Sequence, residues 1–166
     1  MFDKWFCAAR WCYNKAKEVQ DLRYNHGAKP LSKYDIRSFV VSQIPEWFAD
    51  VPFLIKAGAV LDYVDACKNA CIKFKQTGEV SEIGYRSKKT PTQSCVIKPE
   101  SVTKTGIYPT ISGELKTSEP LHTDGESILK RENGKYYMIV TIKNTEKVTC
   151  REPSEDSGDR PRSTLP

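Results

Sequence analysis

The sequence is poor in the residues and motifs that most enzymes use for acid–base or covalent chemistry. Its two histidines, His26 and His122, fall in separate predicted loops without evident partners, and loop histidines are more often solvated than catalytic. No G-x-S-x-G nucleophile motif and no glycine-rich phosphate loop occurs. Asp62 and Asp65, three residues apart on a predicted helix, are more typical of a solvated face than of a metal site. We therefore expect no enzymatic activity from this chain alone, no metal site and no cofactor.

The six cysteines do not follow the spacing of structural zinc sites, because none of them forms a C-x-x-C pair. Cys67 and Cys71 are four residues apart and share a helix face, but two thiols without nearby histidines are an incomplete metal site. A disulfide framework is not expected either. We predict that these cysteines act as small, buried apolar side chains.

Long hydrophobic runs are also absent. No stretch approaches the roughly 18 apolar residues needed to span a bilayer, and residues 1–20 lack the charged, apolar and small-residue zones of a signal peptide. We expect no membrane association and an intracellular protein, cytoplasmic or, in a eukaryotic host, nuclear. The 39% hydrophobic content is enough for the core of one domain or two small lobes.

Charge is modest overall but concentrated in the middle of the chain. The formal net charge is +5, which by itself only suggests a polyanionic partner. The stretch 73–104 is the basic part, with cations at Lys73, Lys75, Arg86, Lys88, Lys89, Lys98 and Lys104 against acids at Glu79, Glu82 and Glu100.

Hydrophobic periodicity predicts three helices in residues 1–78. The first covers 2–24, where apolar residues recur at steps of three and four. The second follows Ser32 as N-cap, ends near Pro45, and has a predicted core face of Ile36, Phe39 and Val40. The third begins with Asp50 as cap and Pro52 in the first turn, continues with core positions such as Phe74, and ends at Gly78.

After residue 78 the pattern changes to short β-prone runs separated by turn residues, at 94–97, 106–108, 128–130 and 136–142. Asn133-Gly134 predicts a two-residue type I′ hairpin turn, which needs positive φ at both positions. The predicted fold class is therefore α+β, with a three-helix lobe (1–78), a small antiparallel β lobe (79–149) and a disordered tail (150–166) that has little to bury.

The best functional candidate is the segment 84–94, GYRSKKTPTQS. Tyr85, Arg86, Lys88, Lys89 and Gln93 crowd cations, an aromatic ring and an amide into a non-helical connection, which suits contacts to phosphates and bases. An ordinary solvated basic loop explains the same residues equally well.

A second candidate lies at the start of the third helix. Lys56 follows Pro52 by about one turn, where the free N–H groups of a helix attract anions. This position suits a contact with a nucleic-acid backbone. The alternative is a solvated lysine opposite the core stripe.

Several short pieces, in order, resemble the transposon-encoded TnpB or OrfB proteins, the RNA-guided nucleases related to Fanzors. Their order and spacing carry the resemblance, which covers about residues 2–145. The pieces are Trp5-Phe6, Arg10-Trp11-Cys12-Tyr13-Asn14, Ile44-Pro45, Val51-Pro52, Ala57, Ala59, Lys68-Asn69-Ala70, Tyr85-Arg86-Ser87-Lys88-Lys89, Gln93-Ser94, Ile107-Tyr108-Pro109 and Gly134-Lys135-Tyr136-Tyr137.

The resemblance implies a helical recognition lobe followed by strands of a wedge β-barrel, which together bind guide RNA and read a short motif in target DNA. It implies nucleic-acid contacts at the loop around Lys33 and Tyr34, at 53–57 and at 92–94. Arg10 also matches, as either a phosphate contact or an ion-pair partner. Tyr13 matches too, and we interpret it as mainly a packing residue.

Two departures limit what the resemblance implies. The family's chain begins with a strand before the first helix, and its nuclease domain, with three metal-binding carboxylates, follows the strand at 136–142. Neither is found here, and without that acidic cluster nothing holds the divalent cations that phosphodiester cleavage requires. The expected function is therefore that of a truncated, transposase-associated protein that binds guide RNA or target DNA without cleaving it.

The tail suggests how the nuclease domain was lost. Residues 151–165, REPSEDSGDRPRSTL, have codons that, read one base later, spell ENQVRIVAIDPGVR. The family has an aliphatic run ending in Asp-Pro-Gly-Val-Arg at this point. A frameshift near Cys150 is our hypothesis. For the function of the chain, the alternatives to nucleic-acid binding are an inert relic of a frameshifted transposon gene, a regulator that competes with a full-length relative, or half of a split nuclease completed by a separate nuclease-domain chain.

Overall fold

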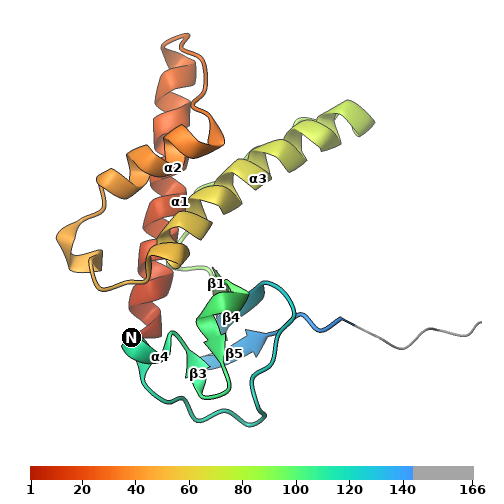
Figure 1. The fold of residues 1–166 in the computed structure, drawn as a ribbon. Helices are drawn as coiled ribbons and strands as arrows, with labels where there is room; N and C mark the ends of the chain where they lie inside the picture. Colours follow the sequence, from red (N-terminus) through yellow and green to blue (C-terminus); the bar gives the residue numbers. More distant parts are fainter. Residues whose placement is uncertain (144–166) are drawn as a thin grey trace, which may run out of the picture.

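The structure, a computed structural model, describes residues 1–143. They form an α+β fold in which the helices come first and a small antiparallel sheet follows (Figure 1). This confirms the predicted fold class. The long helices are α1 (Phe2–Asn25), α2 (Lys33–Ser42) and α3 (Phe53–Thr77), with short helical turns η1 (Glu46–Phe48), η2 (Pro99–Ser101) and α4 (Pro109–Ser112).

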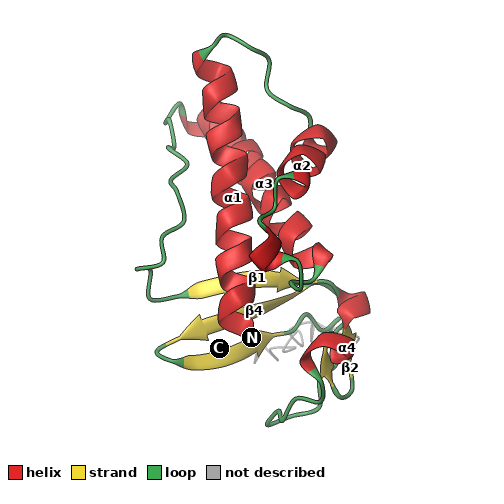
Figure 2. Ribbon diagram, turned by 90° about the vertical axis from the view of Figure 1, so that its left-hand side faces the viewer, coloured by secondary structure: helices red, strands yellow, loops and turns green. Residues whose placement is uncertain are grey.

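Helix α1 stands with its first turns against the sheet (Figure 2). Its apolar residues recur at helical spacing, so one stripe of the helix is buried, including Phe6, Ala9 and Tyr13. No glycine or proline interrupts its 24 residues. The predicted bounds are confirmed to within one residue, and Gly27 turns the chain with a φ of 67° just after the helix ends.

Helix α2 begins at the predicted cap, where the Ser32 hydroxyl accepts a hydrogen bond from the Asp35 N–H at 3.3 Å. Ile36 and Val40 are buried, but the prediction that Phe39 belongs to the core is wrong, because Phe39 is 41% exposed. The buried stripe follows the i, i+4 pair, and Phe39 lies about 100° away from Val40 around the helix. The helix ends at Ser42, before the predicted end near Pro45, and Gln43 is its C-cap.

Helix α3 ends as predicted at Gly78, whose φ is 71°. Asp50 does not cap it, contrary to prediction. Its carboxylate instead pairs with Lys4 at 2.6 Å. Residues up to Tyr63 are buried on the core side, whereas Phe74 is 51% exposed, so its prediction as a core residue is wrong. Figure 1 shows the reason, because the C-terminal half of α3 extends past the helices that cover its start.

The sheet has the strand order β1-β4-β5, all antiparallel, and a separate two-stranded ladder joins β2 and β3. Asn133 and Gly134 connect β4 to β5 with φ values of 51° and 76°, which confirms the predicted hairpin turn. The strand bounds are Gln93–Ile97 for β1, Val102–Thr103 for β2, Gly106–Ile107 for β3, Ser127–Glu132 for β4 and Lys135–Ile139 for β5.

Helices and sheet share one hydrophobic core. Cys95, Ile97 and Leu129 from the inner face of the sheet join buried residues of α1, α2 and α3 in one cluster. The ring of Trp5 on α1 meets that of Tyr108 edge-on, with centroids 5.5 Å apart. The change of secondary structure near residue 78 therefore does not divide this core.

The predicted tail, 150–166, lies outside the described residues. Within residues 1–143, no helix combines the length and the apolar character that a membrane crossing requires.

Candidate nucleic-acid interface

The candidate segment 84–94 runs beside α1 and leads into β1 (Figure 2). One side-chain amide fixes its path. The Asn14 Nδ2 donates to the carbonyl of Arg86 at 2.9 Å, and the N–H of Arg86 donates to Asn14 Oδ1 at 2.8 Å. The amide thus pairs with the backbone as a neighbouring strand would, and the segment is held at one defined point of α1.

Gln93 is the second fixed point. It is 8% exposed, and its Nε2 donates to the carbonyls of Ser87 and Thr90 at 3.0 and 2.8 Å. Its Oε1 accepts from Arg10 Nη1 at 3.0 Å, and Arg10 Nη2 also contacts the Cys7 sulfur at 3.3 Å. Both amide donors and the acceptor are therefore in use. In this arrangement Arg10 and Gln93 hold the turn 87–90 in place, and the amide of Gln93 faces the protein.

The turn that Gln93 closes presents two lysines. Lys88 and Lys89 are exposed, and among residues 1–143 neither ammonium group has an ion-pair partner. The N–H of Lys89 donates a hydrogen bond to the Ser87 hydroxyl at 3.1 Å. Two uncompensated cations are therefore held on a turn with a fixed backbone.

Arg86 faces the protein, unlike these lysines. Its Nη2 lies 3.1 Å from Asp62 Oδ2, and its guanidinium lies 3.9 Å from the centroid of the Tyr13 ring. Burial raises the pKa of the Asp62 carboxyl above its usual value, while Arg86 acts in the opposite direction. Arg86 thus joins the segment to α1 and α3, and Tyr13 is the packing residue that the sequence predicts.

Tyr85 remains more accessible, with 57% of its surface exposed. The ammonium of Lys17 lies 5.0 Å from its ring centroid, and its hydroxyl lies 3.5 Å from Asp21. Lys17 is itself paired with Asp21 at 2.8 Å. The ring is therefore placed beside a largely neutral pair on α1 and is open to solvent.

Lys56 is not the solvated lysine that one sequence interpretation expects. It is 7% exposed, and its Nζ donates to the backbone carbonyls of Phe48 at 3.1 Å and Ala49 at 3.5 Å. These carbonyls lie at the end of η1, and that of Phe48 also accepts from the N–H of Val51 at 3.1 Å. The ammonium group therefore joins η1 to α3 from inside the protein, and its suggested contact with a nucleic-acid backbone stays a prediction.

Lys33 and Tyr34 form the first turn of α2 instead of a loop. Tyr34 is exposed, with the Arg37 guanidinium 5.5 Å from its ring centroid. Figure 2 places α2 and the segment 84–94 on opposite sides of α1. The structure thus brings Arg10, Arg86 and Gln93 together around that segment but leaves Lys33 and Tyr34 at a separate surface.

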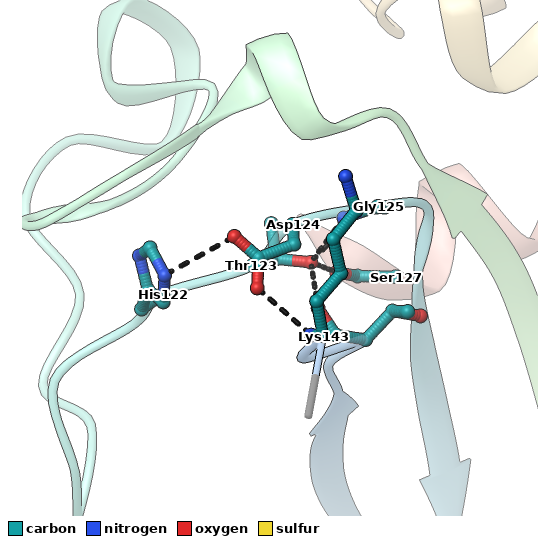
Figure 3. A network of polar contacts seen from close by, with 7 residues as sticks. His122, Thr123, Asp124, Gly125, Ser127 and Lys143 are labelled. Atoms are coloured by element: carbon teal, nitrogen blue, oxygen red, sulfur yellow. Dashed lines mark hydrogen bonds and ion pairs between the residues drawn. The ribbon is translucent and has the colours of Figure 1, made fainter. Parts of the chain in front are cut away.

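The other polar network lies at the base of β4 (Figure 3). The Thr123 hydroxyl donates to the carbonyl of Gly125 at 2.8 Å, and the Ser127 hydroxyl donates to Thr123 Oγ1 at 2.9 Å. Asp124 accepts from the N–H of Lys143 at 2.9 Å and lies 3.4 Å from the exposed ring of His122. These contacts close the turn before β4 against the chain after β5.

The described cysteines are all free thiols. Cys12 and Cys95 are buried as predicted, and Cys7 and Cys67 are partly buried. The prediction is wrong for Cys71, which is exposed because it lies in the C-terminal half of α3, beyond the buried part of that helix. Burial raises the pKa of the Cys12 thiol and that of the Cys95 thiol from 9.0 to about 12. Within residues 1–143, no three or more histidine, cysteine, aspartate or glutamate side chains gather as metal ligands would.

Sequence reasoning missed the partners that position this segment. The contact between Asn14 and Arg86 spans 72 residues, and that between Arg10 and Gln93 spans 83. No local pattern connects such positions. No known family model matches this chain, and no curated protein is significantly similar to it in sequence.

Proposed function

We propose that this chain binds nucleic acid through the segment 84–94, as the resemblance to TnpB and OrfB proteins implies, with guide RNA or target DNA as the partner. The observation that carries the proposal is the pair of uncompensated cations, Lys88 and Lys89, on a turn fixed by the buried amide of Gln93. Its role is binding, and no cleavage step is assigned to residues 1–143.

Preorganisation supports this role. Ordering a flexible lysine-rich loop on a ligand costs conformational entropy, which weakens binding. Here the amide hydrogen bonds of Asn14 and Gln93 have already ordered the backbone on both sides of Lys88 and Lys89. Only the lysine side chains themselves must be ordered when phosphates bind.

The local charge supports the same role. The cations in and beside the segment 84–94 are not equivalent, because Arg86 is paired with Asp62, and Lys17 on α1 is paired with Asp21. Lys88 and Lys89 are the pair on this turn that is available to phosphate. Contacts of this kind depend on salt, since binding releases counterions from the nucleic acid.

The test is the salt dependence of binding, measured by fluorescence anisotropy with labelled single-stranded RNA and with duplex DNA. The variant Lys88→Gln/Lys89→Gln removes both cations, and Lys29→Gln/Lys104→Gln is the matched control with the same change in charge. Lys29 and Lys104 are also exposed. Lys29 lies between α1 and α2, and Lys104 lies between β2 and β3, so both are outside the segment 84–94.

Two lost phosphate contacts lower the slope of log affinity against log salt by about 1.4 for a single strand. We expect that change for the Lys88/Lys89 variant and none beyond the effect of net charge for the control. Equal slopes for the two variants would exclude the segment as the interface. A wild-type chain that binds neither probe at low salt would exclude the proposed function.

A further inference from the structure

The three-stranded sheet has an inner face and an outer face of different character. Cys95 of β1, Leu129 of β4 and Met138 of β5 are register partners that point into the core. Side chains alternate along a strand, so their neighbours point outward. One outward row is Val96, Ile128 and Ile139, and the next is Ser94, Lys130 and Tyr137.

The outward apolar side chains are well exposed in the part of the chain that the structure describes. Ile128 is 40%, Tyr137 47% and Ile139 50% exposed, whereas the register partners Cys95 and Leu129 on the inner face are buried. Together Tyr137, Ile128 and Ile139 form an exposed apolar patch on the open face of the sheet, which we call the platform. Exposed apolar patches of this kind often mark binding sites.

The platform is continuous with the proposed binding segment. Strand β1 begins at Gln93, directly after the turn that carries Lys88 and Lys89, and Ser94 is its first outward residue. From Ser94 the row crosses the sheet to Tyr137 through the register partners of β1, β4 and β5. The same row therefore links the basic turn to the aromatic ring.

The charge around this row favours an anionic partner. Lys130 is the outward residue between Ser94 and Tyr137, and Lys135 is the outward residue two positions before Tyr137. Glu132 is the opposing charge here, and it pairs with Lys130 at 3.0 Å. With Lys88 and Lys89, the row has an excess of positive charge beside an aromatic ring, which is the combination that nucleic-acid surfaces use.

We propose that the outer face of β1-β4-β5 binds a single strand of nucleic acid, with an unpaired base stacked on Tyr137 and the backbone directed toward Lys88 and Lys89. This inference rests on the proposed function and specifies its ligand. An aromatic ring on an open sheet face offers a stacking surface to bases that are splayed out, whereas the bases of a duplex are already stacked on one another and are not accessible to the ring.

The experiment compares Tyr137→Ala with Tyr137→Phe, which keeps the ring, and with Tyr24→Ala, which removes an exposed tyrosine at the far end of α1. Three fluorescent probes are used. They are a mixed-sequence RNA of about 15 nucleotides, the same strand annealed to its complement, and an abasic phosphodiester strand of about equal length. Thermal melts confirm that each variant is folded.

We expect Tyr137→Ala to weaken binding of the single strand by about fivefold or more, the loss that one stacked base causes. It should leave duplex and abasic binding unchanged, because neither offers a base to the ring. Tyr137→Phe and Tyr24→Ala should bind all three probes like the wild type. Wild-type affinity of Tyr137→Ala for the single strand would overturn the inference.

The outcomes separate this inference from the proposed function. If Lys88→Gln/Lys89→Gln weakens binding while Tyr137→Ala does not, the segment 84–94 binds nucleic acid and the sheet face does not. If Tyr137→Ala instead changes the oligomeric state in light scattering and leaves affinity unchanged, the face is a protein interface and the inference fails. If the wild type binds no probe, both proposals fail together.

Discussion

The side-chain amide of Asn14 pairs with both the N–H and the carbonyl of Arg86, which is 72 residues later in the chain. This contact connects the first helix to the start of the segment that presents Lys88 and Lys89. The guanidinium of Arg86 then adds an ion pair with Asp62 on α3. One residue of the segment is thus held through its backbone by α1 and through its side chain by α3.

Replacement of Asn14 by alanine removes both hydrogen bonds with the backbone of Arg86. Leaving partly buried polar groups unpaired costs about 1–3 kcal/mol, so we expect the free energy of unfolding in urea to fall by this amount. Asn69→Ala is the control, because Asn69 is exposed on α3. An Asn14→Ala protein as stable as the control would show that the pairing contributes nothing to the fold.

Gln93→Glu tests the closure of the turn 87–90. A carboxylate cannot donate to the carbonyls of Ser87 and Thr90, which now receive hydrogen bonds of 3.0 and 2.8 Å. We expect a loss of about 1–3 kcal/mol in stability and weaker nucleic-acid binding, because the lysine-bearing turn loses its fixed backbone.

Gln76→Glu is the matched control for Gln93→Glu, since it makes the same change of charge at an exposed position of α3. Its stability should stay within about 0.5 kcal/mol of the wild type, as for most surface substitutions. A Gln93→Glu variant that melts and binds like this control would contradict the assigned role of the amide.

Lys56→Met separates the structural role of this lysine from a role in binding. The substitution removes the buried ammonium group that donates to the carbonyls of Phe48 and Ala49, and the loss of these hydrogen bonds should cost about 1–3 kcal/mol of stability. Binding of nucleic acid by the folded variant should equal that of the wild type. A folded variant with wild-type stability and weakened binding would instead assign Lys56 to the interface. Lys68→Met, at an exposed position, is the control.

The cysteines should differ in reactivity toward a thiol reagent at pH 8. Cys71 is exposed, whereas Cys12 and Cys95 are buried with pKa values raised to about 12. Because the thiolate is the reactive form, we expect Cys71 to react quickly and the two buried thiols to react only when the protein unfolds. In denaturant all six cysteines should react. Equal rates for Cys12 and Cys71 in the native protein would contradict the structure.

The same two thiols predict the pH dependence of stability in alkali. In the unfolded chain each thiol loses its proton near its ordinary pKa of 9.0, while the folded protein holds the proton up to a pKa of about 12. The folded state therefore binds more protons in this window, and stability falls as pH rises from about 9 to about 12, by up to about 1.4 kcal/mol per pH unit and thiol. Urea unfolding of Cys12→Ala/Cys95→Ala should show a smaller decrease with pH than the wild type.

The coding DNA offers a test of the frameshift hypothesis, which concerns residues outside the described structure. Read one base later from the codon of Cys150, the gene should encode an aliphatic run ending in Asp-Pro-Gly-Val-Arg, as the codons allowed for residues 151–165 permit. Sequencing this region in all three frames provides the answer. A shifted frame without such a run would end the hypothesis and leave the binding proposals unaffected.

Local sequence features determined the elements of this protein. The helical spacing of apolar residues predicted α1 to within one residue, Ser32 predicted the cap of α2, and Asn133-Gly134 predicted the hairpin of β4 and β5. These predictions succeed because hydrophobic periodicity, capping and positive φ depend on residues close together in the chain.

The tertiary structure alone decided which charged and polar side chains are available at the surface. In the sequence Arg86 and Lys88 are both cations of the same basic segment. In the structure Arg86 forms an ion pair with Asp62, whereas Lys88 is exposed. Lys56 is buried and donates to the carbonyl of Phe48 in η1. Gln93 accepts a hydrogen bond from Arg10, which is 83 residues earlier in the chain. Whether a cation is free for phosphate depends on the partner that folding brings to it, and these partners come from distant parts of the chain, where no local pattern identifies them.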